Sequence, residues 1–189
     1  TRQRRLEKDV AVRARCPLLA EALGFVGHPP IRHRGTIGGS LAHADPAAEL
    51  PAVLALVGGH VEAVAWRSGR LASRRIAAAD LFAGPLQTTL AADELVVAAT
   101  FPALAARTGW AVDELARRHG DYALAGVALT VTVDGDGAPV AGRAAYLSCG
   151  PTPVVLDLGP AAADAAAVRD LVAGSLRPSD DIHATGDYR

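Results

Sequence analysis

The chain has 189 residues, of which 50% are hydrophobic and 21% charged, a composition typical of a folded globular protein and not of a disordered one. Its net charge of −1 gives no indication of binding to nucleic acid or to an anionic membrane. No apolar run approaches the ~20 residues that a transmembrane helix needs. Two cysteines, Cys16 and Cys149, are too few for a zinc or iron–sulfur site. With no signal peptide we expect a cytoplasmic protein with free thiols, and a disulfide is the alternative.

Helical periodicity marks two segments of the first sixty residues. The spacing of leucine, alanine and valine over 17–27 predicts a helix. The next stretch, 28–44, is so rich in proline, glycine and polar residues that we expect no regular element there. The Asp-Pro pair at 45–46 predicts the start of a second helix, which continues to Val57 and ends at two glycines. Glu49 then lies in its first turn, at the positive end of the helix dipole.

Alternating and apolar runs predict strands in the middle of the chain. Residues 60–66 alternate like a strand, and 70–76 are expected to return beside them through a Ser-Gly turn. A short helix is expected over 78–82. The run ELVVAATF, 94–101, is typical of a buried strand that ends at a proline.

The second half of the chain predicts a hairpin and a long helix. Residues 110–118 fit a helix or a strand equally well, whereas 127–150 form two alternating runs around Asp-Gly-Asp-Gly, which is a strong hairpin signal. An alanine-rich helix is expected over 159–175, and a last short helix after Pro178. Strands in groups, with helices set on one side of the C-terminal antiparallel sheet, predict an α+β fold.

A boundary between two domains is expected near residues 102–109. A proline ends the strand there, and glycine and small residues follow it. We therefore expect one domain over 1–104 and a second over 105–189.

The stretch TIGGS, residues 36–40, carries the clearest sign of chemistry. Gly38 and Gly39 let main-chain N–H groups approach a ligand without an intervening Cβ, and consecutive N–H groups in such a turn form an anion-binding nest. The hydroxyls of Thr36 and Ser40 offer two more donors to phosphate oxygens. Neither the P-loop motif nor the Rossmann glycine motif is present. From the residues alone, an ordinary glycine turn remains the alternative.

Other polar groups do not match a recognised site. Histidines 28, 33, 43 and 60, with Asp45 and Glu49, lack the spacing of metal ligands, and solvated side chains explain them better. Cys149 ends a predicted strand without a basic neighbour, so it is expected to be a core thiol.

A family resemblance covers nearly the whole chain. The run RCPLLAEALGFVGHPPIRHRGTIGGSLAHADPAAELPAVLAL, 15–56, resembles the second flavin-binding segment of the medium, FAD-binding subunit of molybdenum hydroxylases. This family includes aerobic carbon monoxide dehydrogenases and xanthine dehydrogenases. The similarity continues through 116–129, 150–158 and 180–189, and TIGGSLAHADPAAELP is its most specific part. The resemblance also implies that the family's first glycine-rich segment would precede Thr1.

The resemblance assigns binding roles to particular residues. It implies that the TIGGS residues lie on the FAD pyrophosphate and that Glu49 touches the adenosine half. Leu95 or Val96 would lie near the flavin or the adenine, and Tyr122 would pack by the isoalloxazine. At Glu114, eight residues before Tyr122, some members carry a flavin-contacting lysine. The cofactor-binding residues so implied are Thr36, Ile37, Gly38, Gly39, Ser40, Glu49, Leu95, Val96 and Tyr122.

The resemblance also implies a role in electron transfer. The chain would be the FAD-binding subunit of an oxidoreductase complex, with a large subunit that holds the molybdenum cofactor and a small subunit that holds [2Fe–2S] clusters. FAD would pass electrons from these clusters to an acceptor such as NAD or a quinone. No residue is expected to act as an acid, base or nucleophile, because the flavin performs the redox chemistry. The alternative is a flavin-free fragment that serves only for subunit docking.

Overall fold

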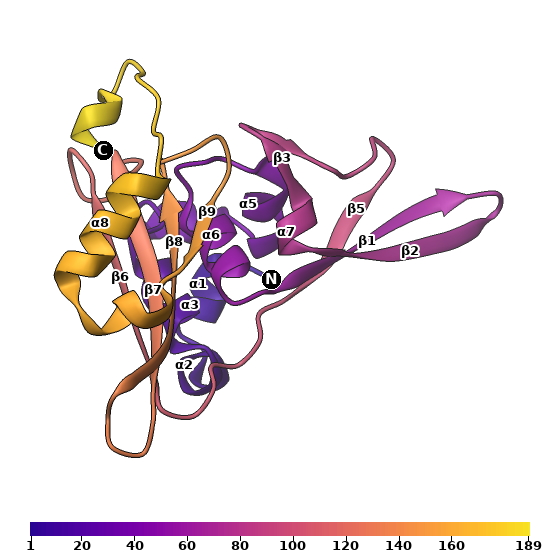
Figure 1. Ribbon diagram of the computed structural model, residues 1–189. Coiled ribbons are helices and arrows are strands. Elements are labelled where there is room, and N and C mark those ends of the chain that lie inside the picture. Colours follow the sequence, from indigo (N-terminus) through magenta and orange to yellow (C-terminus); the bar gives the residue numbers. More distant parts are fainter.

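The computed structural model describes all residues from Thr1 to Arg189 (Figure 1). Helices dominate the first third of the chain, and antiparallel strands dominate the rest. A three-stranded sheet extends from the body like a wing, and a four-stranded sheet lies at the opposite end (Figure 1). This mixed architecture confirms the predicted α+β class.

Six short helices form the N-terminal part. Only α3 and α6 contribute extensively to the core: four residues of α3 are buried, and α6 is buried almost throughout because it is apolar on all sides. α6 packs against α3 and against the strands β7 and β8. The helices are α1 (Gln3–Glu7), α2 (Val10–Arg15), α3 (Pro17–Phe25), α4 (Pro29–Arg34), α5 (Ile37–His43) and α6 (Glu49–Leu56).

The wing comprises β1 (His60–Arg67), β2 (Arg70–Ala77) and β5 (Leu95–Thr100) in the order β2-β1-β5. Ser68 and Gly69 connect β1 to β2 with φ angles of 52° and 73°. Positive φ at both turn positions matches the right-handed twist of a two-residue hairpin, as the sequence predicted. Between β2 and β5 lie α7 (Ala78–Leu81) and the small hairpin of β3 (Phe82–Gly84) and β4 (Gln87–Thr88).

The four-stranded sheet has the order β6-β7-β8-β9, with every pair antiparallel. On one face, α3 and α6 cover β6, β7 and β8, and on the other lie η1 (Gly159–Ala163) and α8 (Ala165–Ser175) (Figure 1). A short turn of 3-10 helix, η2 (Gly186–Tyr188), precedes the last residue. The strands are β6 (Thr108–Leu115), β7 (Ala125–Val133), β8 (Pro139–Leu147) and β9 (Val154–Asp157).

The stretch 28–44, expected to be irregular, forms the helices α4 and α5 instead. Proline occupies the first turn of α4, where its missing N–H is tolerated, and Thr36 caps α5. The second helix begins at Glu49 and not at 45–46, because Asp45 accepts a hydrogen bond from Ala47 N at 2.9 Å and closes a local turn. In 28–44, capping and proline in the first turn allow helices despite the polar and glycine-rich composition. At 45–48, the Asp45 hydrogen bond forms a turn where a helix was predicted.

Three further expectations differ from the structure. β5 lies at the edge of the wing, so Leu95 and Val97 are exposed where a buried strand was expected. The alanine-rich segment 159–175 divides at Asp164, whose side chain caps α8 by accepting from Ala166 N. No helix follows Pro178 directly, since the chain forms only η2 near its end. The ambiguous segment 110–118 lies mostly in β6.

Candidate functional site

The TIGGS residues form the cap and first turn of α5. Thr36 Oγ1 accepts a hydrogen bond from Gly39 N at 2.9 Å, and the main-chain oxygen of Thr36 accepts from Ser40 N at 3.1 Å. Ile37 N donates to the main-chain oxygen of Thr1 at 3.1 Å. The main-chain N–H groups of Thr36 and Gly38 have no acceptor in the chain, so the predicted nest offers these two free donors.

Gly38 and Gly39 differ in how strictly the structure requires glycine at each position. A Cβ on Gly39 would lie 2.8 Å from Thr36 Oγ1, too close to keep the cap, so this position requires glycine. A Cβ on Gly38 would lie 3.5 Å from the Val96 side chain, an ordinary contact. The absence of a side chain at Gly38 therefore leaves its free N–H approachable by a ligand. The Ser40 hydroxyl makes no hydrogen bond within the chain and is available beside it.

The first three residues of the chain pair with the backbone just before and within the TIGGS turn. Gln3 N donates to the main-chain oxygen of Gly35 at 3.0 Å, and Arg2 forms an isolated bridge with Thr36. A Cβ on Gly35 would collide with the buried Gln3 side chain. These contacts hold the backbone that enters α5.

A second group of polar residues surrounds the first residue of α6. Glu49 is only 9% exposed, and burial raises its pKa to about 7, with the Glu114 and Asp45 carboxylates adding to the rise. Burial also raises the pKa of Glu114 to about 7, with help from Asp113. The pKa of the Tyr122 phenol is raised by burial and by Asp45 and Glu49, which places these three residues near one another.

The nearest cation does not neutralise these carboxylates. Arg32 is buried, but its guanidinium donates to Glu7 Oε2 at 3.0 Å and to the main-chain oxygens of Val26 and Gly27. Its hydrogen bonds thus hold α1 against the turn before α4. The positive charge of Arg32 lowers the pKa of Glu49, but by less than burial raises it.

The loop between β6 and β7 presents Tyr122 to this group. Ser148 Oγ donates to the main-chain oxygen of Ala123 at 2.6 Å, which fixes the end of the loop. At Gly120, φ is 86° and a Cβ would collide with the His28 ring, so glycine allows the loop to lie against the residue that caps α4. Tyr122 is 68% exposed, which leaves its ring free to pack against a planar ligand.

Comparison with known protein families shows which family this chain belongs to. Residues 1–104 match the family model described as the FAD binding domain in molybdopterin dehydrogenase. The chain belongs to this family. Its cofactor is FAD, and the resemblance inferred from TIGGSLAHADPAAELP is confirmed.

Individual relatives are subunits of dehydrogenase complexes. The chain is 36% identical, over its whole length, to the 6-hydroxypseudooxynicotine dehydrogenase complex subunit alpha of Paenarthrobacter nicotinovorans, of which it covers 65%. It is 34% identical over 94% of its length to the carbon monoxide dehydrogenase medium chain of Hydrogenophaga pseudoflava, of which it covers 63%. The chain therefore spans a little less than two thirds of these relatives.

Solved structures agree with the sequence relatives. A chain of carbon monoxide dehydrogenase from Hydrogenophaga pseudoflava superposes over the whole of this chain with a TM-score of 0.86 and 33% identity, and 67% of that chain is covered. Quinoline 2-oxidoreductase from Pseudomonas putida 86 gives a TM-score of 0.84 with 33% identity and 66% of its chain covered. This chain is thus built like a flavin-binding medium subunit of the molybdenum hydroxylases.

The structure gathers the candidate residues into two groups. One is the TIGGS turn with Val96, which lies against Gly38. Leu95, the residue before Val96, alternates to the opposite face of the wing and is 67% exposed. The other group is Glu49 with Tyr122. The sequence analysis recognised Glu114 only as a position of substitution. Nothing in the local pattern of β6 indicates that one oxygen of this carboxyl is shielded from solvent without a hydrogen-bond partner.

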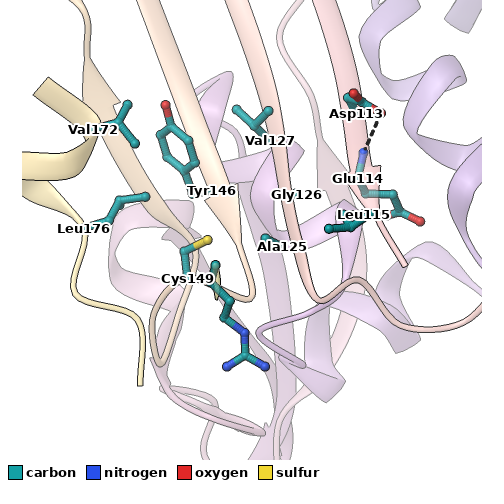
Figure 2. A pocket seen from close by; sticks show the side chains of 11 residues that line it. Asp113, Glu114, Leu115, Ala125, Gly126, Val127, Tyr146, Cys149, Val172 and Leu176 are labelled. Carbon is teal, nitrogen blue, oxygen red and sulfur yellow. Dashed lines mark hydrogen bonds between the residues drawn. The ribbon is translucent and has the colours of Figure 1, made fainter. Parts of the chain in front are cut away.

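A cavity lies elsewhere, between α8 and the outer face of β6, β7 and β8 (Figure 2). It measures about 470 Å³, and Tyr146, Cys149, Val172 and Leu176 lie around it. Burial raises the pKa of the Cys149 thiol, so it is a poor nucleophile at neutral pH. Glu114 also lines this cavity, and Figure 2 shows its carboxyl directed away from Tyr146 and Cys149.

Two other features bear on possible sites. No group of three or more histidine, cysteine, aspartate or glutamate side chains is arranged to hold a metal ion. None of the helices combines the length and apolarity needed to traverse a lipid bilayer.

Proposed function

We propose that this chain binds FAD with its pyrophosphate at the TIGGS turn and its isoalloxazine beside Tyr122, and that it serves as the electron-transfer module of a molybdenum hydroxylase. The observation that carries the proposal is the first turn of α5. There the Gly38 N–H and the Ser40 hydroxyl are both without partners in the chain, and Gly38 has no side chain of its own to cover its N–H. A phosphate oxygen is a strong acceptor for two such donors.

The remaining candidate residues fit the rest of a dinucleotide. Val96 supplies an apolar surface beside Gly38, and Glu49 supplies a carboxyl at the start of the next helix. The exposed ring of Tyr122 supplies a flat apolar surface. The bound flavin would supply the redox chemistry, and these residues would bind and orient it.

The names of two relatives, a medium subunit and a medium chain, support a multi-subunit complex. We propose that the chain works with a large subunit that carries the molybdenum cofactor and a small subunit that carries [2Fe–2S] clusters, and that an acceptor such as NAD or a quinone takes the electrons. Residues 1–104 would form the flavin-binding domain and 105–189 a second domain. Free, buried Cys16 and Cys149 are compatible with the reducing cytoplasm that we propose as its location.

The test is FAD binding by the purified chain. We expect flavin absorbance to remain with the protein after gel filtration, and Ser40→Ala to weaken FAD binding by about 10-fold, since a hydrogen bond to a charged group contributes ~1.5–3 kcal/mol. Ser73→Ala, an exposed serine on the wing, is the matched control and should bind FAD like the unaltered chain. A folded chain that retains no flavin would support the docking module instead.

A further inference from the structure

The cavity between α8 and the outer face of the four-stranded sheet, here called the α8 cavity, contains none of the proposed FAD-binding residues. It measures about 470 Å³, within the range of ~300–1,000 Å³ usual for small-molecule pockets. In its floor Asp113 pairs with Val127, and Val127 with Tyr146, so these three side chains lie on the same face of the sheet. The opposite wall is Val172 of α8 with Leu176, which follows directly after the helix.

α8 is an amphipathic helix that does not bury its apolar side. Val168, Leu171 and Val172 recur at helical spacing, but no residue of α8 is buried. The helix packs chiefly against η1 and scarcely against the strands, because the cavity separates them. A surface helix normally stabilises a fold by burying such a side, so apolar area on both walls of the cavity stays uncovered here. A ligand that fills the space would bury this area.

The charged groups around the α8 cavity favour an uncharged ligand. The Arg189 guanidinium donates to Asp181 Oδ2 at 2.7 Å and to two main-chain oxygens, so it is not free to bind an anion. Asp113 Oδ1 accepts from Glu114 N at 2.9 Å, and the Glu114 carboxyl is directed away from Tyr146 (Figure 2). Asp113 is exposed, so its solvent-screened attraction for a cation is too weak to offset the desolvation of that cation.

The Tyr146 hydroxyl is a free polar group in the α8 cavity. It makes no hydrogen bond within the chain, and its ring lies between Val172 and Val127 in Figure 2. Burial raises the pKa of this phenol and that of the Cys149 thiol, so both groups are uncharged at neutral pH. A phenol donates to a carbonyl, ether or hydroxyl oxygen and accepts from a hydroxyl. The lining therefore combines apolar walls with a neutral hydrogen-bonding group.

We propose that the α8 cavity binds an uncharged, largely apolar molecule of the size of a naphthalene derivative, with an oxygen hydrogen-bonded to the Tyr146 hydroxyl. A cavity of ~150 Å³ is sufficient for benzene, so the larger volume here leaves room for a larger ring system. Water in this space has few polar partners, and an apolar group that displaces such water gains affinity. The inference goes beyond the proposed function and does not depend on it, because binding at this cavity requires no flavin.

Naphthalenes that differ in one group test the chemistry of the site: 1-naphthylmethanol, 1-naphthoate and 1-naphthylmethylammonium. Isothermal titration calorimetry should show saturable binding of the alcohol, with both ions binding at least about 10-fold more weakly, because burying an unpaired charge is costly. Val127→Phe fills the space and should abolish binding of the alcohol. Val140→Phe, at a position of β8 that is 59% exposed and outside the cavity, is the matched control. No saturable binding of the alcohol, or equally tight binding of either ion, would overturn the proposal.

A more conservative variant and an NMR measurement test the hydrogen bond and the location. Tyr146→Phe removes only the hydroxyl, so binding of 1-naphthylmethanol should weaken by about 5-fold, the loss of one hydrogen bond. Binding of 1-methylnaphthalene, which lacks the oxygen, should be unchanged. In the unaltered chain with labelled valine and leucine methyl groups, the alcohol should shift the signals of Val127, Val172 and Leu176 most and leave Val140 unchanged. Equal losses for both probes in Tyr146→Phe would overturn the hydrogen bond, and methyl shifts centred outside the cavity would overturn its location.

Discussion

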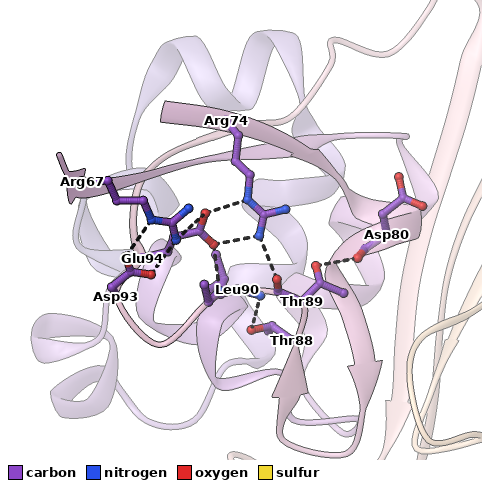
Figure 3. Close-up of polar contacts among 9 residues, drawn as sticks. Arg67, Arg74, Asp80, Thr88, Thr89, Leu90, Asp93 and Glu94 are labelled. Atoms are coloured by element: carbon purple, nitrogen blue, oxygen red, sulfur yellow. Dashed lines mark hydrogen bonds and ion pairs between the residues drawn. The ribbon is translucent and has the colours of Figure 1, made fainter. Parts of the chain in front are cut away.

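Two regions of this molecule handle carboxylates in opposite ways. On the wing, Arg67 binds Asp93 through two hydrogen bonds of 2.7 and 2.6 Å, and Arg74 binds Glu94 through two of 2.7 Å (Figure 3). This arginine clamp, Arg67, Arg74, Asp93 and Glu94, fastens the segment before β5 across β1 and β2. Glu49 and Glu114, in the body of the molecule, have no such partners.

The difference shows that burial and pairing are separate properties. Glu94 has only 4% of its side chain exposed, but the two guanidinium groups cover it and it lies at the periphery. The Arg74 hydrogen bonds lower the pKa of Glu94 to about 2, while burial without a cation raises that of Glu49 to about 7. Pairing with a cation stabilises the ionised form of a carboxyl group, whereas burial without a cation stabilises its protonated form.

The largest expected effect is a fall in the free energy of unfolding as the pH rises towards the pKa of Glu49, about 7. The unfolded chain releases the Glu49 proton near pH 4.5, while the folded chain keeps it until about pH 7. The contribution is therefore complete below pH 4.5 and is lost between pH 4.5 and 7, at a cost of about 3 kcal/mol from Glu49 alone. Urea unfolding at closely spaced pH values measures it. Glu49→Gln should flatten this part of the profile, and a profile that rises across it would contradict the raised pKa.

A somewhat smaller effect is expected from replacing one acid by an apolar residue. Glu114→Leu removes a partly buried carboxyl with an unpaired oxygen, so the variant should be more stable at pH 8 by about 1 kcal/mol, a low value because the side chain is only half-buried. At pH 5 the gain should vanish, because the carboxyl is then neutral in the unaltered chain. Thermal unfolding at the two pH values compares them, and equal gains at both would mean that packing and not charge is responsible.

The smallest effect is expected at the arginine clamp. Glu94→Gln removes the charge that Arg74 binds on the surface of the wing, and the loss of stability at pH 7 should be within about 1 kcal/mol and should shrink further in high salt. In the unaltered chain this contribution is present above pH 4.5 and disappears as the pH falls towards 2. Glu62→Gln, whose carboxylate lies 3.9 Å from Arg75, is the control for a weaker surface pair. A loss of stability in Glu94→Gln as large as that expected from ionising Glu49 would contradict the expectation of a weak, solvent-screened ion pair.

Local sequence was sufficient for the elements whose determinants are short-range. The β1–β2 hairpin follows from alternation around Ser68-Gly69, and α3 follows from apolar periodicity after Pro17. The TIGGS turn was predicted to be a ligand-binding stretch from two glycines between two hydroxyls. Its form as the start of a helix was not recognised, because the cap depends on the Thr36 side chain closing on Gly39 N.

The sequence by itself determined the family, the α+β class and the identity of most candidate residues, since a contiguous motif carries its own chemistry. Only the tertiary structure decided which N–H groups of the TIGGS turn stay free, which of Leu95 and Val96 faces Gly38, and how deeply Glu49 is buried. Glu49 becomes buried because α6 packs against β7 and β8, which lie far from it in the chain. The protonation of a carboxyl depends on such neighbours and on the loss of water, and neither can be read from a local pattern.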